Sequence, residues 1–152
     1  FARRMEPRQD TFDVNEVIRE ALSFIEKEAS FREVELVRQL DPELPVIKSD
    51  RAQLQQVLLN LANNALDAVA DGGRILVSSR SESDCLVLTV EDDGCGIPIE
   101  LHDQIFDPFF TTKAPGEGSG LGLSVCHTIV KGLEGSLTFE SAPGEGTVFE
   151  LR

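Results

Sequence analysis

Three polar side chains recur along one face of the helix expected around residues 59–69, which read LNLANNALDAV. Asn60, Asn64 and Asp67 stand at positions i, i+4 and i+7, so they form one column on the helix surface. Amide oxygens are suitable hard ligands for Mg²⁺, which usually keeps several waters and lets substrate phosphates complete its shell. Two such amides could share one metal shell, although a solvated helix face explains the same pattern. Asn63 lies off this column and is expected to be an ordinary exposed or capping amide.

A second candidate is the segment VEDDGCGIP, residues 90–98. A strand ends there in Asp92, and Gly94 and Gly96 allow backbone conformations and a close ligand approach that a Cβ would forbid. A carboxylate fixed at a strand end can accept a hydrogen bond from an exocyclic amine such as that of adenine, which would distinguish adenine from guanine. Acidic-glycine turns are also common, so the segment alone is compatible with an ordinary turn.

A third candidate is GEGSGLGLSV, residues 116–125, where glycine-rich backbone runs into an expected helix. Such a segment offers a row of N–H donors and a positive dipole end, which together form an anion cradle. It matches neither the GxxxxGK[ST] phosphate loop nor GxGxxG after a strand, which disfavours those nucleotide folds. Taken singly, it could also be a structural turn.

Between these two glycine-rich segments lies IFDPFFTTK, residues 105–113. Three phenylalanines in an irregular stretch indicate a flap that packs down over a ligand, and Lys113 is the natural cation to reach a terminal phosphate. The alternative is that the phenylalanines form a satellite core under a long loop.

The elements that would position these residues can be placed from periodicity and capping signals. A helix over about 14–29 begins at Asp13, with Glu16 as its capping-box partner, and a second helix over about 50–70 ends at Gly72-Gly73. The pattern predicts an α+β fold: a two-layer sandwich with a mixed sheet of about five strands and three helices on one face. The other expected elements are strands 34–40, 74–80 and 85–92, a helix 121–132 and a closing hairpin over 135–151.

Composition limits the functional classes. The 152 residues suffice for one domain with its own core, and no apolar run approaches the roughly 20 residues of a membrane helix. A net charge of −13 argues against nucleic acid as a partner, because phosphate binding at such a surface needs clustered Lys and Arg. The three cysteines, Cys85, Cys95 and Cys126, show no metal or redox spacing and are expected to be reduced packing thiols of a cytoplasmic protein.

The motifs together resemble the catalytic ATP-binding domain of bacterial sensor histidine kinases. LQQVLLNLANNALDA resembles its asparagine box, DDGCGIP its first glycine box, IFDPFFTTK its phenylalanine box, GSGLGL its second glycine box and GEGTVFEL its closing strand. The match covers about residues 11–152, and the PFFTTK form looks most like the nitrogen-regulation and oxygen-sensing branches. The resemblance implies the Bergerat-type fold shared with gyrase, Hsp90 and MutL ATPases, with an ATP lid over about 98–118. Residues 1–10 would then be a linker or the tail of an upstream helix.

The resemblance implies Mg-ATP as ligand and assigns roles to the matching positions. Asn64 would ligate Mg²⁺, Asn60 would assist with the metal and the phosphates, and Lys113 would meet the γ-phosphate. Asp92 would hold the adenine amino group. The remaining contacts would be Gly94, Gly96, Ile97 and, through water, Thr147 around adenine, and Gly118, Ser119, Gly120, Leu121 and Gly122 along the phosphates.

One position separates the kinases from the hydrolases of this fold. The hydrolases typically carry a Glu one turn before the metal-binding Asn, where it acts as general base on water, and here that residue is Asn60. An amide cannot abstract a proton, so the site is suited to holding ATP for another acceptor. Two departures from the family pattern are mild: Asp67 stands where many relatives place a basic residue, and Glu134 replaces a glycine common in a turn.

The acceptor expected from the resemblance is a histidine, and neither of the two here fits. His102 lies in the segment that aligns with the lid, and Pro108 follows it by six residues rather than five. His127 lies inside a helix and is expected to be a packing or surface residue. We therefore expect a monomeric fragment whose parent is a homodimer, with its phosphoacceptor and dimerisation domain upstream of Phe1 and a response regulator downstream. The parent can still carry a membrane segment.

The function that follows from the resemblance is ATP-dependent protein-histidine kinase, the kinase step of two-component signal transduction. Two other functions remain open at this stage: an ATP-hydrolysing member of the same fold, and a non-catalytic nucleotide-binding or interaction module.

Overall fold

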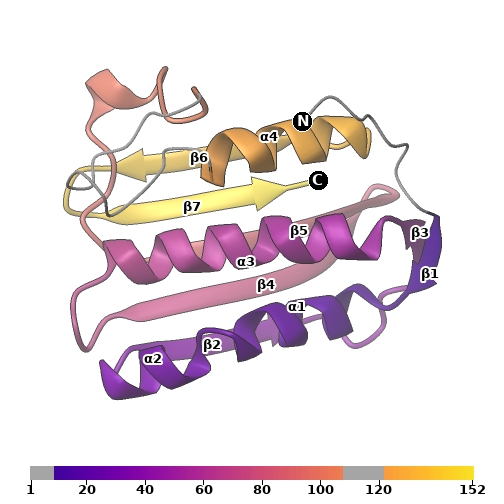
Figure 1. Ribbon diagram of the computed structural model, residues 1–152, viewed down its shortest axis with the longest axis horizontal. Helices are drawn as coiled ribbons and strands as arrows, with labels where there is room; N and C mark the ends of the chain where they lie inside the picture. The colour runs from indigo at the N-terminus through magenta and orange to yellow at the C-terminus, as the bar shows by residue number, and fades with distance from the viewer. Residues whose placement is uncertain (1–8, 108–121) are drawn as a thin grey trace.

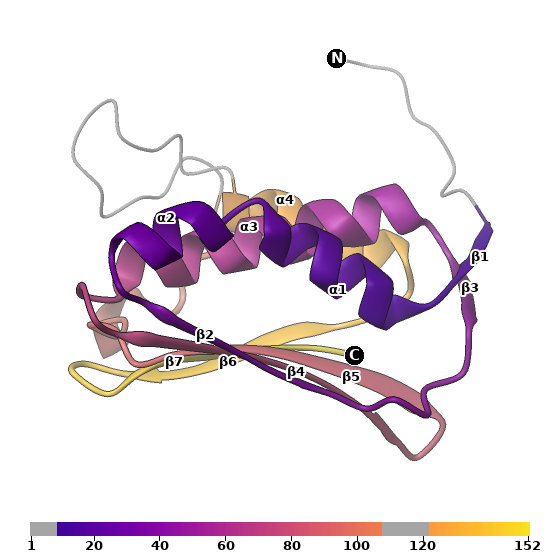
Figure 2. The ribbon, with the colours of Figure 1, turned by 90° about the horizontal axis from the view of Figure 1, so that it is seen from below.

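The computed structural model describes residues 9–107 and 122–152. The chain forms a layer of strands and a layer of helices, and α1 to α4 all lie on one side of the main sheet (Figure 2). This sheet has five strands in the order β2-β4-β5-β7-β6, and a separate small sheet pairs β1 with β3. The strands are β1 Asp10–Phe12, β2 Glu35–Leu40, β3 Ile47–Ser49, β4 Arg74–Glu82, β5 Cys85–Asp92, β6 Leu137–Ala142 and β7 Gly146–Leu151.

The main sheet is mixed. Strand β2 runs parallel to β4, whereas β4–β5, β5–β7 and β6–β7 are antiparallel pairs. Figure 1 shows α3 crossing the middle of the sheet, with α1 and α2 over one edge and α4 over the other. The prediction of a two-layer sandwich with a mixed five-stranded sheet is confirmed.

Residues 9–107 and 122–152 contain four α-helices where three were expected: α1 Val14–Ser23, α2 Glu26–Phe31, α3 Arg51–Ala68 and α4 Gly122–Gly132, with a short 3₁₀ helix η1 at Ile99–Leu101. The predicted helix 14–29 is two helices, because the Phe24 and Ile25 N–H groups donate to carbonyls three residues back and tighten the chain. The apolar spacing continues through Ile25 and Ala29, so it gave no sign of this break. Asp13 is the N-cap as predicted, and its carboxylate accepts from the Asn15 N–H (2.9 Å).

The second predicted helix, α3, ends at Ala68, four residues before the glycine pair that was expected to cap it. At this end the Arg32 guanidinium donates to the carbonyl of Leu66 in the last turn (2.7 Å) and to that of the C-cap residue Val69 (2.6 Å). A side chain from another element thus supplies the cap. Gly72 instead forms the following turn, with φ +82°.

The core lies between α3 and the inner face of the sheet. On α3 the buried side chains include Val57, Leu58 and Leu61, and on the sheet they alternate along each strand. In β5 this alternation places Leu88, Val90 and Asp92 in one buried row. Asp92 is therefore the last member of a core-facing row, and the fold brings its carboxyl to the helix layer.

The small sheet was not predicted. Ile47–Ser49 follows two prolines in a segment where no element was expected, yet it pairs antiparallel with Asp10–Phe12. Strands of three residues are too short for a periodicity signal, which is why the sequence pattern missed them.

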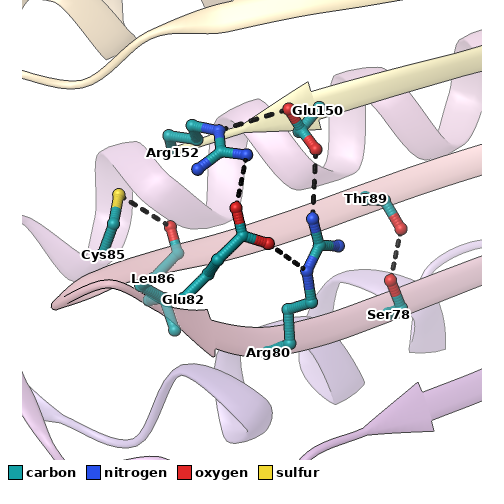
Figure 3. Close-up of polar contacts among 8 residues, drawn as sticks. All are labelled: Ser78, Arg80, Glu82, Cys85, Leu86, Thr89, Glu150 and Arg152. Atoms are coloured by element: carbon teal, nitrogen blue, oxygen red, sulfur yellow. Dashed lines mark hydrogen bonds and ion pairs between the residues drawn. The ribbon is translucent and has the colours of Figure 1, made fainter.

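The outer face of the main sheet is polar and largely paired with itself (Figure 3). Arg80 contacts Glu82 (3.1 Å) and reaches across β5 to Glu150 (3.4 Å), while Arg152 contacts Glu82 (3.0 Å) and Glu150 (3.3 Å). Beside them, the hydroxyls of Ser78 and Thr89 form a hydrogen bond. Within the described ranges, no helix combines the length and apolar character needed to cross a membrane.

Candidate nucleotide site

The asparagine column lies on the part of α3 that the core leaves accessible. Asn60 and Asn64 are half-buried, whereas Asn63 and Asp67 are exposed. The difference matters because a half-buried side chain is held by its neighbours and still partly exposed, which fits the predicted role of Asn60 and Asn64 as ligands of an ion shared with a bound nucleotide. Asn63 is thus the exposed amide that the sequence predicted.

Helix α4 packs against α3 beneath Asn60. The thiol of the fully buried Cys126 donates to the Val57 carbonyl (3.8 Å), one turn before Asn60. Burial raises the pKa of the Cys126 thiol to about 11, and a hydrogen bond with the Asn60 side chain partly opposes this shift. The thiol is therefore neutral at physiological pH, and it ties Asn60 to the helix that follows the second glycine-rich segment.

Asp92 is a buried carboxyl with backbone donors. It is 7% exposed, and the Gly94 N–H donates to its Oδ1 (2.9 Å). Burial raises the pKa of Asp92 above its usual value, while hydrogen bonds from the Gly94 and Thr147 backbones oppose the shift. Two N–H donors fix the direction of this carboxylate, so its remaining lone pairs can select a partner that carries a donor.

Two glycines allow the segment after Asp92 to pass close to the backbone of Ala68 and Ala142. A Cβ on Gly94 would lie 2.4 Å from the Ala68 carbonyl oxygen, and one on Gly96, whose φ is +75°, would lie 2.0 Å from the Ala142 oxygen. Both contacts are with backbone, so neither can be relieved by a rotamer change. The Cys95 N–H also donates to the Ala68 carbonyl (3.3 Å), which joins the Asp92 loop to α3 one turn after Asn64.

Thr147 and Ile97 close the other side of this loop. Thr147 is directly opposite Asp92 in the β5–β7 pairing, and it is buried. The Ile97 N–H donates to Ser141 Oγ (2.8 Å), and Ser141 Oγ also lies 2.8 Å from Thr147 Oγ1. The motifs did not point to Ser141. Its place opposite Thr147 in the closing hairpin is the signal that could have found it.

The segment after Ile97 packs through aromatic rings. His102 lies edge-on to Phe139 (centroids 5.0 Å apart) and its Nε2 is 2.9 Å from the Ile97 carbonyl oxygen. Phe106 stacks on His127 (4.9 Å) and meets Phe139 edge-on (5.8 Å). His127 was expected to be a packing or surface residue, and it packs against Phe106. Phe106 itself packs against the main core cluster, and the other two phenylalanines of the expected flap lie outside the described residues.

Five residues of the predicted site lie outside the described part of the chain. Lys113, Gly118, Ser119, Gly120 and Leu121 lie outside the described residues, whereas Gly122 opens α4 and is half-buried. The described residues therefore bring together the adenine end of the predicted site, Asp92, Gly94, Gly96, Ile97 and Thr147, and link it through Ala68 to the helix that carries Asn60 and Asn64.

Known proteins share this fold and much of this sequence. Residues 49–152 match the family described as histidine kinase-, DNA gyrase B-, and HSP90-like ATPase. The chain is 37% identical over 152 residues to the signal transduction histidine-protein kinase AtoS of Escherichia coli (strain K12), covering 99% of this chain and 25% of AtoS.

Two solved structures extend the comparison. The nucleotide-free catalytic domain of histidine kinase ThkA has a TM-score of 0.85 and 34% identity, covering 95% of this chain and 93% of that one. Histidine kinase ThkA in complex with the response regulator protein TrrA has a TM-score of 0.80 and 32% identity, covering 94% of this chain and 40% of that one.

The chain belongs to the histidine kinase-, DNA gyrase B- and HSP90-like ATPase family. Within that family it is a catalytic domain of the histidine kinase type, because it matches the ThkA catalytic domain over almost the full length of both. The resemblance drawn from its motifs is confirmed. The chain spans about a quarter of AtoS, 25% of that protein's length.

Proposed function

We propose that this domain binds Mg-ATP beside α3 and donates the γ-phosphoryl group to a histidine on another domain of its parent protein. The bond between the γ-phosphorus and the bridging oxygen breaks, a P–N bond forms at the imidazole, and ADP leaves. The acceptor domain would be an upstream dimerisation domain, the parent a homodimer in the cytoplasm or anchored to a membrane, and the next acceptor a response regulator. Phosphoryl transfer of this kind needs mainly positioning and charge stabilisation from the protein.

The proposal rests on one observation: the loop that follows Asp92 contacts the helix that carries Asn60 and Asn64. Asp92 is a buried, directed acceptor for the base, and its loop contacts Ala68 on the same helix that presents Asn60 and Asn64. Because Asn60 stands where a hydrolase places its glutamate, no general base for water is available at that position. This supports transfer to a protein acceptor over hydrolysis.

The donor set fits Mg²⁺. Asn60 and Asn64 are half-buried and would contribute neutral amide oxygens, and Mg²⁺ commonly combines few protein ligands with waters and phosphate oxygens. In the described part of the chain, no group of three or more His, Cys, Asp or Glu side chains could hold a metal ion. The amides and the phosphates would therefore share the ion, which would offset phosphate charge in this acidic protein.

Calorimetry tests the binding half of the proposal. We expect ATP to bind in the presence of Mg²⁺, and Asn64→Ala to weaken that binding by about tenfold or more, because a charged-group contact is worth roughly 1.5–3 kcal/mol. Asn63→Ala is the matched control, since it removes an exposed amide from the same turn. No binding to the unchanged chain, or equal losses in both variants, would contradict the proposal.

Phosphorylation tests the transfer half. The parent's histidine-bearing domain, supplied as a separate protein, should gain acid-labile, base-stable phosphate when mixed with this chain and Mg-ATP, and Asn64→Ala should abolish it. Steady ATP turnover by the chain alone, also lost in Asn64→Ala, would instead indicate a hydrolase. Binding without either reaction would indicate a non-catalytic nucleotide module.

A further inference from the structure

Ser141 stands where three parts of the adenine end meet. Its hydroxyl oxygen accepts from the Ile97 N–H (2.8 Å), donates to the Gly146 carbonyl (3.0 Å) and lies 2.8 Å from Thr147 Oγ1. It therefore connects the loop after Asp92 with the first two residues of β7. No motif drew attention to it, and the proposed function gives it no role.

With all three hydrogen bonds made at once, only one placement of the protons satisfies this oxygen. A hydroxyl carries one proton and two lone pairs. The Ile97 N–H can only donate, so it occupies one lone pair, and the Gly146 carbonyl can only accept, so it takes the proton. The remaining lone pair faces Thr147, whose hydroxyl must therefore donate to Ser141.

This arrangement decides what Thr147 offers to a ligand. Once its proton is given to Ser141, Thr147 Oγ1 has only lone pairs left and can accept hydrogen bonds but not donate them. Asp92, its partner across the β5–β7 pair, is also an acceptor on the same buried face. Both side chains can therefore accept directly from a base edge that carries an amine, and neither can donate directly to a carbonyl oxygen.

We infer that Ser141 is a positioning residue that sets base specificity, because it holds Thr147 in the acceptor role while fixing the Ile97 backbone. The inference rests on the proposed function, since it concerns the same nucleotide. Ser141 contacts no ligand itself and acts through Thr147 and Ile97. A chain with Ser141 prefers a 6-amino purine over a 6-oxo purine more strongly than one without it.

The test compares ATP with inosine triphosphate, in which a carbonyl oxygen replaces the 6-amine. In Ser141→Ala the Thr147 proton is released and can turn to a carbonyl, so ATP should bind about fivefold more weakly while inosine triphosphate binds as well or better. The ratio of the two Kd values should fall by at least about fivefold. Ser141→Thr, which keeps the hydroxyl, should retain the ratio of the unchanged chain.

A double variant shows whether Ser141 acts through Thr147. Thr147→Val alone should reduce the preference, and adding Ser141→Ala should change it no further, because the step that Ser141 controls is already lost. Additive losses would mean that Ser141 acts by another route and would overturn the inference.

Ser79→Ala is the structural control. Ser79 is also buried in the sheet and also bonds several groups, donating to Asn15 Oδ1 (2.7 Å) and accepting from the Asp41 N–H (3.1 Å), but away from Asp92. It should lower the melting temperature and leave the nucleotide preference unchanged. If Ser79→Ala shifts the preference as Ser141→Ala does, or if Ser141→Ala weakens both nucleotides equally, the role of Ser141 is merely structural.

Two further outcomes are distinguishable. If the unchanged chain binds neither triphosphate, the proposed function fails and this inference fails with it. If it binds both equally, nucleotide binding stands and only the inference is overturned. Should Ser141→Ala not fold, Ser141→Cys gives the same comparison. A thiol fills the site but is only a weak hydrogen-bond acceptor, so it no longer holds the Thr147 proton firmly.

Discussion

Alanine substitutions at four glycines can separate two reasons why a position requires glycine: a steric conflict with a Cβ and a left-handed backbone conformation. At Gly94 an added Cβ would lie 2.4 Å from the Ala68 oxygen, with no unusual φ. At Gly72 the reverse holds: φ is +82° and nothing lies within 4 Å. Gly96 has both constraints, with φ +75° and 2.0 Å to the Ala142 oxygen, and Gly132 in α4 has neither. An alanine at each position therefore separates steric conflict from backbone strain.

The expected changes in the free energy of unfolding follow from steric conflict and backbone strain. Gly132→Ala should stabilise by about 0.4–1 kcal/mol, because alanine restricts the unfolded chain. Gly72→Ala should destabilise by about 1 kcal/mol, since the left-handed conformation costs about 1–2 kcal/mol for an L-residue and the same restriction offsets part of it. Gly94→Ala should cost about 1–3 kcal/mol by forcing backbone apart. Gly96→Ala combines both causes and should cost the most.

Urea denaturation and ATP calorimetry on the four variants give two independent readings. The free energy of unfolding should follow the order above, but ATP affinity should fall only for Gly94→Ala and Gly96→Ala, whose strained contacts belong to the Asp92 loop. If Gly94→Ala is as stable as Gly132→Ala, the close approach to Ala68 is not present. If Gly72→Ala weakens ATP as much as Gly94→Ala does, affinity follows overall stability and the loop has no separate role.

Three further predictions follow from single contacts. Burial holds the pKa of Asp92 in the folded chain above its ordinary value of 3.8, so Asp92 favours the folded state most below pH 3.8, and this effect is lost as the pH rises through the folded pKa. Over that pH range the melting temperature of the unchanged chain should therefore fall relative to that of Asp92→Asn. A difference between the two melting temperatures that stays constant with pH would contradict the burial of Asp92. Arg32→Ala should lower the free energy of unfolding by about 2–3 kcal/mol in urea denaturation, because the carbonyls of Leu66 and of the C-cap residue Val69 lose their donor. Asp71→Ala removes only the exposed partner of the Arg32–Asp71 ion pair and should cost under about 1 kcal/mol. Similar costs would mean that the cap contributes nothing. Glu134→Gly should stabilise by a few tenths to about 1 kcal/mol, because Glu134 has φ +63°, and a loss of stability would refute strain at that turn.

The sequence predicted those helices and strands whose apolar pattern is local and repeats several times. The strands β4 and β5 and the long helix α3 each carry several turns or alternations of apolar residues, and their existence and order were predicted correctly. Their ends were less predictable, because an end depends on partners from elsewhere in the chain. Arg32, more than thirty residues before the end of α3, supplies the donors for two carbonyls at that end, and no pattern within α3 records this.

The same distinction applies to the site. Asp92, Gly94 and Gly96 were identified because a motif places them together in sequence, and the structure gives each a contact that explains its residue type. Ser141 was missed because its importance arises only when β6, β7 and the Asp92 loop meet. A serine in a hairpin has no signature of its own until the register sets it opposite Thr147.

The two ends of the site therefore differ in what they tolerate. At the proposed adenine end, a Cβ added to Gly94 or Gly96 would lie within 3 Å of a backbone oxygen, and the Ser141 hydroxyl already has three hydrogen-bond partners. Changes of volume by one carbon should therefore matter there as much as changes of chemistry. At the proposed metal end, Asn60 and Asn64 project from a regular helix, so their amide oxygens rather than an unusual backbone carry the proposed preference for Mg²⁺. The Asn60 side chain is also tied to Cys126 by a hydrogen bond. Nucleotide preference should then respond to substitutions around Ser141 and Gly96, and Mg²⁺ dependence to those on α3. A variant of one end that altered the property of the other would show that the contact of Cys95 with Ala68 couples them.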